Sequence, residues 1–276
     1  MPSRQSDSAV LNEKAMLATM IRGITSFVLA LSLIAATPTL AQELNLPEGP
    51  SPVVVVELFT SQSCPSCPDA DEFVGGLQTR SDVIVLSWPV DIWDYLGWED
   101  TLASSENTRR QAQYNGRFGL RWPYTPEIVI DGRTHIAGNQ GDAVLTRIEE
   151  IRDDSWVQVS MRMRIDDDRL TINVGSAPDE IDDKLGTIWL IPYRSHANVE
   201  IGGGPNEGRV LSYTNVAEGN QPISQWSGNS VIVRHPLDLE PGNTPDGYVV
   251  LLQKHRNGPI LGAARLQLTW NGASTE

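Results

Sequence analysis

Two cysteines separated by two residues carry the most specific chemistry in this chain. Cys64 and Cys67 are its only cysteines, and they lie in Ser-Cys-Pro-Ser-Cys-Pro directly after the apolar run 53–59. A strand that ends at Cys-x-x-Cys, with a helix beginning at the second cysteine, places the first sulfur at the positive end of that helix. Unpaired N–H groups there favour thiolate over thiol. We therefore predict that Cys64 is the nucleophile and that Cys67 resolves the mixed disulfide.

Two other roles for the pair remain open. A structural bridge across two intervening residues closes a very short loop, so it removes little conformational entropy from the unfolded chain. The spacing therefore favours a redox or metal role over a structural one. A copper or zinc site from both thiolates and a histidine such as His135 is chemically sensible, although no spaced partner motif accompanies the pair.

A threonine–proline pair is the next candidate. Thr125 and Pro126 precede the apolar strand expected at 127–130. X-Pro bonds are where cis peptide bonds occur, and a cis proline would place the Thr125 backbone beside Cys64, where it could pair with a peptide substrate. We predict a cis bond here, with both residues binding substrate.

Trp93 and Glu57 complete the predicted site. Trp93 belongs to the aromatic-rich segment 88–98, which would either form a wall of a substrate groove or pack a long connection onto the core. Glu57 is an acid inside an apolar run. It is either solvent-facing or buried beneath the thiols, where desolvation would raise its pKa and let it relay a proton to Cys67 as a catalytic residue.

The elements that must position these residues change character near residue 155. Apolar runs at 53–59 and 82–87 with a helix between them predict a βαβ unit with parallel strands. A helix at 104–114, a hairpin turning at Asp131-Gly132 and an amphipathic helix at 142–151 follow. From 156 onward short alternating strands predict a β-sandwich. The expected fold is thus an α/β thioredoxin-like domain at 53–152, followed by a mainly antiparallel β-sandwich domain at 156–270.

The first residues have the features of a targeting segment. Arg22 precedes the apolar stretch 24–36, and Thr39-Leu40-Ala41 supplies small residues for signal-peptidase cleavage near Ala41. We predict a signal peptide at 1–41, a proline-rich linker at 42–52 and a periplasmic or secreted protein. The apolar stretch is short and interrupted for a membrane span, so we expect none in the mature chain, with an uncleaved anchor as the alternative.

The net charge and the lack of a phosphate-binding motif exclude several classes of binding partner. The formal net charge of −14 disfavours nucleic acid and anionic membranes. The glycine-rich segment 201–209 lacks the Lys-Ser/Thr ending of a phosphate-binding loop, so it is expected to be a long turn between sandwich strands. We predict no cofactor and no resident metal.

Several segments resemble a known family, and they are Glu57–Pro68, Val90–Trp98, Tyr124–Gly132, Asn206–Val216 and Gly258–Ala264. They are similar to a secreted thioredoxin-like family catalogued as domain of unknown function 1223. The resemblance implies a thioredoxin-like fold with a redox-type pair, a nucleophilic Cys64, a resolving Cys67 and a cis-type Pro126, with no established substrate. The chain departs from the family pattern at Pro89, where many relatives carry histidine, which weakens a metal site that needs that ligand.

Taken together, the residues predict an exported protein whose Cys-x-x-Cys pair performs thiol–disulfide exchange with a protein or a small thiol. A periplasmic copper-handling protein and a non-catalytic scaffold that binds a partner are the alternatives.

Overall fold

The computed structural model describes residues 53–153, 157–237, 244–255 and 257–268, and more of these residues lie in strands than in helices. The predicted signal peptide at 1–41 and the predicted linker at 42–52 lie outside these residues. Residues 154–156, where the predicted boundary between the two domains falls, also lie outside them. The first-half strands are β1 (Val54–Thr60), β2 (Val83–Pro89), β3 (Glu127–Ile130) and β4 (Thr134–Ala137). The later strands are β5 (Met161–Asp166), β6 (Arg169–Val174), β7 (Gly186–Glu200), β8 (Val210–Ala217), β9 (Gln221–Trp226), β10 (Val231–Pro236), β11 (Gly247–Lys254) and β12 (Ile260–Gln267).

Three α-helices occur in the described residues: α2 (Cys67–Leu77), α3 (Ser105–Phe118) and α4 (Gly141–Asp153). Two single 3-10 turns, η1 (Asp94–Leu96) and η2 (Gly204–Asn206), lie in loops. Ser104 is the N-cap of α3, because its hydroxyl accepts a bond from the Asn107 N–H. The predicted hairpin also forms, with Asp131 and Gly132 both at positive φ, as a two-residue turn of this kind requires.

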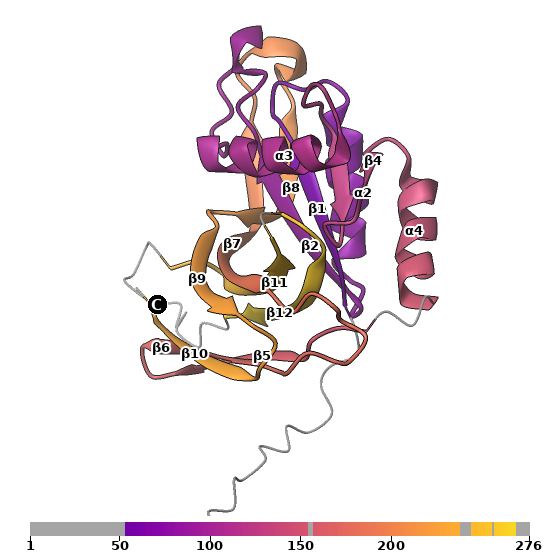
Figure 1. Cartoon of the computed structure of the whole chain (residues 1–276). Helices are drawn as coiled ribbons and strands as arrows, with labels where there is room; N and C mark the ends of the chain where they lie inside the picture. Colours follow the sequence, from indigo (N-terminus) through magenta and orange to yellow (C-terminus); the bar gives the residue numbers. More distant parts are fainter. Residues whose placement is uncertain (1–52, 154–156, 238–243, 256, 269–276) are drawn as a thin grey trace, which may run out of the picture. The chain divides into compact units, whose positions relative to one another are not determined.

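The strands form two sheets, and this corrects the predicted fold class. Nine strands build one mixed sheet in the order β12-β11-β7-β8-β2-β1-β3-β4, with β9 also paired to β7, and β10-β6-β5 form a second sheet. The prediction of a thioredoxin-like α/β domain followed by a separate β-sandwich is therefore wrong: strands from both halves share the large sheet (Figure 1).

Strand β7 explains how the two halves share a sheet. Its first half pairs with β11 on one side and β9 on the other, and its second half pairs with β8. Strand β8 then meets β2 in parallel at the pair Ser87 and Val216. Side chains reinforce this short junction, because the Ser87 hydroxyl donates to the Thr214 carbonyl at 2.8 Å and the Asn215 amide donates to the Val85 carbonyl at 3.0 Å.

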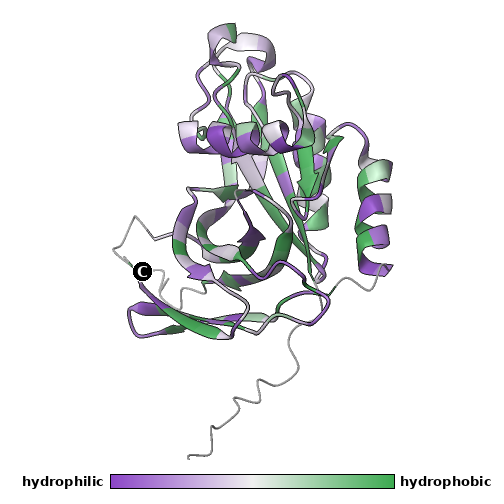
Figure 2. Ribbon diagram, in the orientation of Figure 1, coloured by the Kyte–Doolittle hydropathy of each residue, from purple (hydrophilic) through white to green (hydrophobic). Residues whose placement is uncertain are grey.

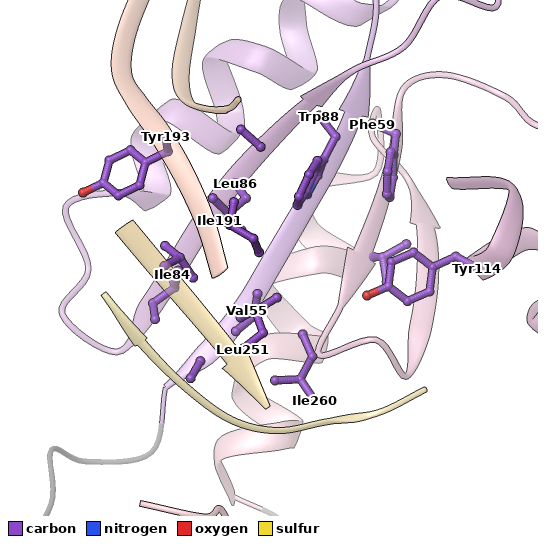
Figure 3. Close-up of a cluster of buried hydrophobic side chains, with 14 of the residues drawn as sticks. Val55, Phe59, Ile84, Leu86, Trp88, Tyr114, Ile191, Tyr193, Leu251 and Ile260 are labelled. Carbon is purple, nitrogen blue, oxygen red and sulfur yellow. The ribbon is translucent and has the colours of Figure 1, made fainter. Parts of the chain in front are cut away.

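The helices cover opposite faces of the sheet. Ala70, Val74 and Leu77 of α2 pack with α4 against the β1 face that carries Val54, Val56 and Leu58. Helix α3 packs Tyr114 on the other face, in a cluster to which Phe59, Trp88, Ile191 and Leu251 also contribute (Figure 3). This second core joins residues from β1 and β2 to residues from β7 and β11. Helix α3 is mostly hydrophilic, whereas β1 and β2 are largely hydrophobic (Figure 2).

Candidate functional site

The cysteine pair lies where β1 gives way to α2. Cys67 is the first residue of α2, Cys64 precedes it in a tight turn, and the two form a disulfide with their Cα atoms 5.4 Å apart. The Cys67 N–H donates to the Cys64 carbonyl at 3.3 Å, which closes the turn. Cys67 is fully buried and Cys64 is 3% exposed, while Pro65 and Ser66 between them are exposed. Cys64 is thus the sulfur nearer to solvent.

No side chain caps the start of α2. Ser66 is the N-cap residue, but its hydroxyl makes no capping bond to the helix and lies 3.5 Å from the Cys64 Sγ instead. Pro68 occupies the first turn, where its missing N–H costs little. The partial positive charge of an uncapped helix start stabilises a nearby thiolate. The described geometry agrees with the environment predicted for Cys64.

A buried carboxyl that the sequence reading missed stands one turn beyond Cys67. Asp71 is 6% exposed, its Oδ2 accepts from the Thr60 hydroxyl at 3.0 Å, and its Oδ1 has no hydrogen-bond partner among the described residues. Burial raises the pKa of Asp71 well above its usual value; the Thr60 bond opposes this and nearby Asp100 adds to it. Residues four apart on a helix share one side of it, so Asp71 and Cys67 both belong to the buried side of α2.

Asp100 is a second buried carboxyl near the cysteine turn. It accepts the Gln62 N–H at 2.8 Å and the Leu102 N–H at 2.9 Å. Burial raises its pKa to about 6, partly offset by these backbone bonds. The negative charge of Asp100 also raises the pKa of Asp71, because two like charges in a buried site disfavour each other.

A cavity of about 300 Å³ links Asp71 to the surface between α2 and β8. Asp71 and Gly75 line it on the helix side, and the exposed Arg209 and the buried Thr214 are among the residues that line it on the other. A proton on Asp71 therefore has a route to solvent that does not pass the disulfide.

The three predicted substrate-binding residues are brought together. The Thr125–Pro126 bond is cis, as predicted, and Pro126 immediately precedes β3, which pairs with β1. The Trp93 indole N–H donates to the Thr125 hydroxyl at 2.8 Å. Gly138 fits between Pro126 and Ala70 of α2, since a Cβ there would lie 2.7 Å from the Cβ of the first and 3.0 Å from that of the second. Trp93, Thr125 and Pro126 thus form one loop cluster against the first turns of α2.

Glu57 lies on the opposite face of the sheet. Its two carboxylate oxygens accept from Arg110 at 2.6 and 2.9 Å, and the Tyr114 hydroxyl also donates to it. The side chains of Glu57, Arg110 and Tyr114 are all buried between β1 and α3. The burial half of the prediction for Glu57 is confirmed, but its contacts are with α3, not with α2, which carries Cys67. Its proposed proton relay stays a prediction.

His135 belongs to a separate polar cluster on β3 and β4. Its Nδ1 lies 2.9 Å from the Tyr124 hydroxyl and 3.8 Å from Glu127. Burial raises the pKa of Glu127 to about 7, while a bond from Gln111 lowers it. In the described part of the chain, no three His, Cys, Asp or Glu side chains are grouped to hold a metal ion. Likewise, no helix within the described ranges is long and apolar enough to cross a membrane.

Comparisons with known proteins give a family and a fold. The sequence profile of a family described as "Protein of unknown function (DUF1223)" matches residues 55–253. A crystal structure of an Agrobacterium tumefaciens protein is similar with a TM-score of 0.70 and 29% identity, covering 82% of this chain and 99% of that one. HBP35 of Porphyromonas gingivalis matches with a TM-score of 0.56 over 79% of this chain and 76% of that one; at 12% identity this likeness concerns the fold alone. No curated protein matches.

Proposed function

The chain belongs to the DUF1223 family, whose description carries no activity, and we propose from the geometry of its cysteine site that it performs thiol–disulfide exchange with a protein or small-molecule thiol. One observation carries the proposal: a disulfide at an uncapped helix start has a buried, protonatable carboxyl one helical turn away. A disulfide that only braces the chain would need neither feature.

The exchange from the disulfide form runs in two displacements. A partner thiolate attacks the Cys64 sulfur, the bond between Cys64 and Cys67 breaks, and Cys67 leaves as a thiolate that takes a proton from the Asp71 carboxyl. A second partner thiolate then attacks the partner sulfur of the mixed disulfide and releases Cys64 as a thiolate. The partner thiols become a disulfide, and the cysteine pair gains two electrons. Asp71 recovers its proton through the cavity between α2 and β8.

Burial sets the order of these roles. Cys67 is inaccessible, so the incoming thiolate meets Cys64, and the 3% exposure of Cys64 means that neighbouring groups must move to admit it. A charged leaving group in a buried site needs a proton nearby, because an isolated buried charge is costly. Burial raises the pKa of Asp71 well above its usual value, which favours the protonated carboxyl that would supply that proton.

The proposed setting is outside the cytosol, as the predicted signal peptide implies, because disulfides persist in oxidising compartments. A periplasmic or secreted thiol protein would meet both unfolded proteins and small thiols there. No described feature favours copper handling or a non-catalytic scaffold over exchange, and neither is developed further.

The test compares two reduced single-cysteine variants. Cys67→Ser, which keeps Cys64, and Cys64→Ser, which keeps Cys67, are each mixed with oxidised glutathione at neutral pH, and the mixed disulfide is followed by mass spectrometry. We expect Cys67→Ser to react at least about tenfold faster, because it keeps Cys64, the sulfur nearer to solvent, whereas Cys67 is fully buried. Equal rates in the two variants would contradict the assignment of Cys64 as the nucleophile.

A further inference from the structure

The glycine-rich segment between β7 and β8 packs on the cysteine turn. The sequence predicts a long turn between sandwich strands here, but its residues meet the other half of the chain. A Cβ on Gly203 would lie 2.8 Å from the Gly97 carbonyl oxygen, and a Cβ on Gly202 would lie 2.9 Å from the Trp98 ring. Trp98 in turn donates its indole N–H to Gln62 at 2.8 Å, next to the cysteines. The glycines are therefore needed for close approach at this contact.

Asn206, at the end of η2, reaches from this segment into the cysteine turn. Its amide nitrogen donates to the Gln62 carbonyl and to the Cys64 carbonyl, each at 2.9 Å, across 142 residues of sequence in the second case. The side chain is 2% exposed. Both amide hydrogens are thus used on the backbone on either side of Ser63.

The orientation of that amide is fixed from its other side. The Arg209 guanidinium donates to the Asn206 Oδ1 at 3.1 Å, so the oxygen faces the cation and the nitrogen faces the two carbonyls. Backbone bonds close the loop around it, from the Gly208 N–H to the Ile201 carbonyl at 2.8 Å and from the Ile201 N–H to the Arg209 carbonyl at 2.9 Å. Hydrogen bonds therefore fix both the orientation of the Asn206 amide and the loop that carries it.

We infer that Asn206 is a positioning residue that sets the reduction potential of the Cys64–Cys67 pair. The Cys64 carbonyl accepts from both Asn206 and the Cys67 N–H, so the amide braces the turn that brings the two sulfurs together. The disulfide requires that closed turn, whereas two thiols do not. Removing the Asn206 amide takes one hydrogen-bond donor from each of the Gln62 and Cys64 carbonyls. The resulting loss of free energy falls mainly on the oxidised form, which depends on the closed turn.

The experiment equilibrates the full chain with mixtures of reduced and oxidised glutathione and measures the oxidised fraction by alkylation and mass spectrometry. We expect Asn206→Ala to shift the equilibrium about tenfold toward the dithiol, about 30 mV for a two-electron couple. Asn198→Ala is the matched control, because it removes an exposed amide that bonds Ser212 on the same hairpin, and we expect no shift. An unchanged equilibrium in Asn206→Ala would overturn the inference.

A second readout separates positioning from plain structural support. Urea unfolding of the oxidised and reduced forms should show a larger loss of stability in oxidised Asn206→Ala than in its reduced form, in proportion to the shift in the glutathione equilibrium. Equal losses in the two forms would identify a structural role only and overturn the inference.

If Asn206→Ala does not fold, Arg209→Met removes only the exposed guanidinium that orients the amide. It should shift the equilibrium in the same direction by a smaller factor, and no shift would count against the inference. The inference deepens the proposed function of the same pair, yet these equilibria need no partner protein. A negative result in the single-cysteine experiment would count against the proposed exchange function, whereas a negative result in the glutathione equilibrium of Asn206→Ala would count only against the role of Asn206.

Discussion

At the scale of single residues, the sequence identified the cysteine pair of the proposed exchange site but not the buried carboxyl of Asp71. The pair Cys64 and Cys67 forms the predicted disulfide at the predicted helix start. The sequence does not single out Asp71, because a carboxylate in the first turns of a helix is ordinarily explained by its favourable interaction with the helix dipole. The overlooked signal was its spacing of four residues from Cys67, which places both side chains on one buried face.

Replacing Asp71 tests its role in proton transfer. We expect Asp71→Asn to slow reduction of the disulfide by dithiothreitol by about 10²-fold near neutral pH, the lower end of what general acid catalysis contributes. The rate is measured by the appearance of free thiols over a range of pH. Glu57→Gln is the control, because Glu57 lies on the other face of the sheet. If Glu57→Gln slowed the reaction and Asp71→Asn did not, the relay would belong to Glu57, as the sequence first suggested.

The raised pKa of Asp71 also predicts how stability depends on pH. An unfolded aspartate ionises near pH 4, whereas Asp71 keeps its proton to higher pH in the folded protein. Between those two pKa values the folded state binds more protons than the unfolded state, so stability falls as pH rises.

An amide in place of this carboxyl has no proton to lose, and the Asp71→Asn variant should therefore gain stability relative to the natural chain as pH rises through that window. The gain is at most about 1.4 kcal/mol per pH unit. Urea denaturation at a series of pH values measures it. Parallel stability curves for the two proteins would contradict the raised pKa.

At the scale of elements, α3 is attached to the sheet by polar side chains. Arg110 pairs with Glu57 and lies over the Trp88 and Tyr114 rings at 4.9 and 5.1 Å. Gln253 of β11 donates to the Tyr114 hydroxyl at 2.8 Å, so the same network reaches β11. The sequence predicts this helix at 104–114 but not its buried face, because an arginine and a glutamate 53 residues apart show no pattern that pairs them.

Removing one partner of this ion pair should be costly. We expect Arg110→Met to lower the free energy of unfolding by about 3–5 kcal/mol, because Glu57 is left as an uncompensated buried charge. Arg109→Met, at the exposed neighbouring position, should change it by less than about 0.5 kcal/mol. Chemical denaturation of both variants checks this, and similar small effects in the two would contradict a buried pair.

At the scale of the whole molecule, local patterns predicted most strands but not their partners. Strand β11 is buried along nearly its whole length, a feature of a central strand covered on both faces, rather than the one-sided alternation of a sandwich. The apolar residues of Tyr248–Gln253 carry that signal, which contradicts the predicted sandwich from 156 onward. The junction of β2 with β8 had no local signal, because the Asn215 side chain and the Val85 carbonyl that it bonds are 130 positions apart.

The shared sheet predicts one unfolding transition for the described fold. We expect tryptophan fluorescence and far-ultraviolet circular dichroism to follow a single urea transition. Ser87→Ala should move the midpoint of both probes together, lowering stability by about 1–3 kcal/mol because the buried Thr214 carbonyl loses its donor. Ser212→Ala, at an exposed hydroxyl on the same strand as Thr214, is the control. Two separate transitions would indicate the independent domains that the sequence first suggested.

The most direct test of exchange at Cys64 is covalent capture in the organism from which the chain comes. Cys67→Ala keeps the attacking thiol and lacks the resolving one, so mixed disulfides with true partners should accumulate. We expect adducts that dithiothreitol releases and that are absent from the Cys64→Ala/Cys67→Ala double variant. Finding no more adducts in Cys67→Ala than in the double variant, in oxidising and reducing growth conditions alike, would contradict exchange at this site.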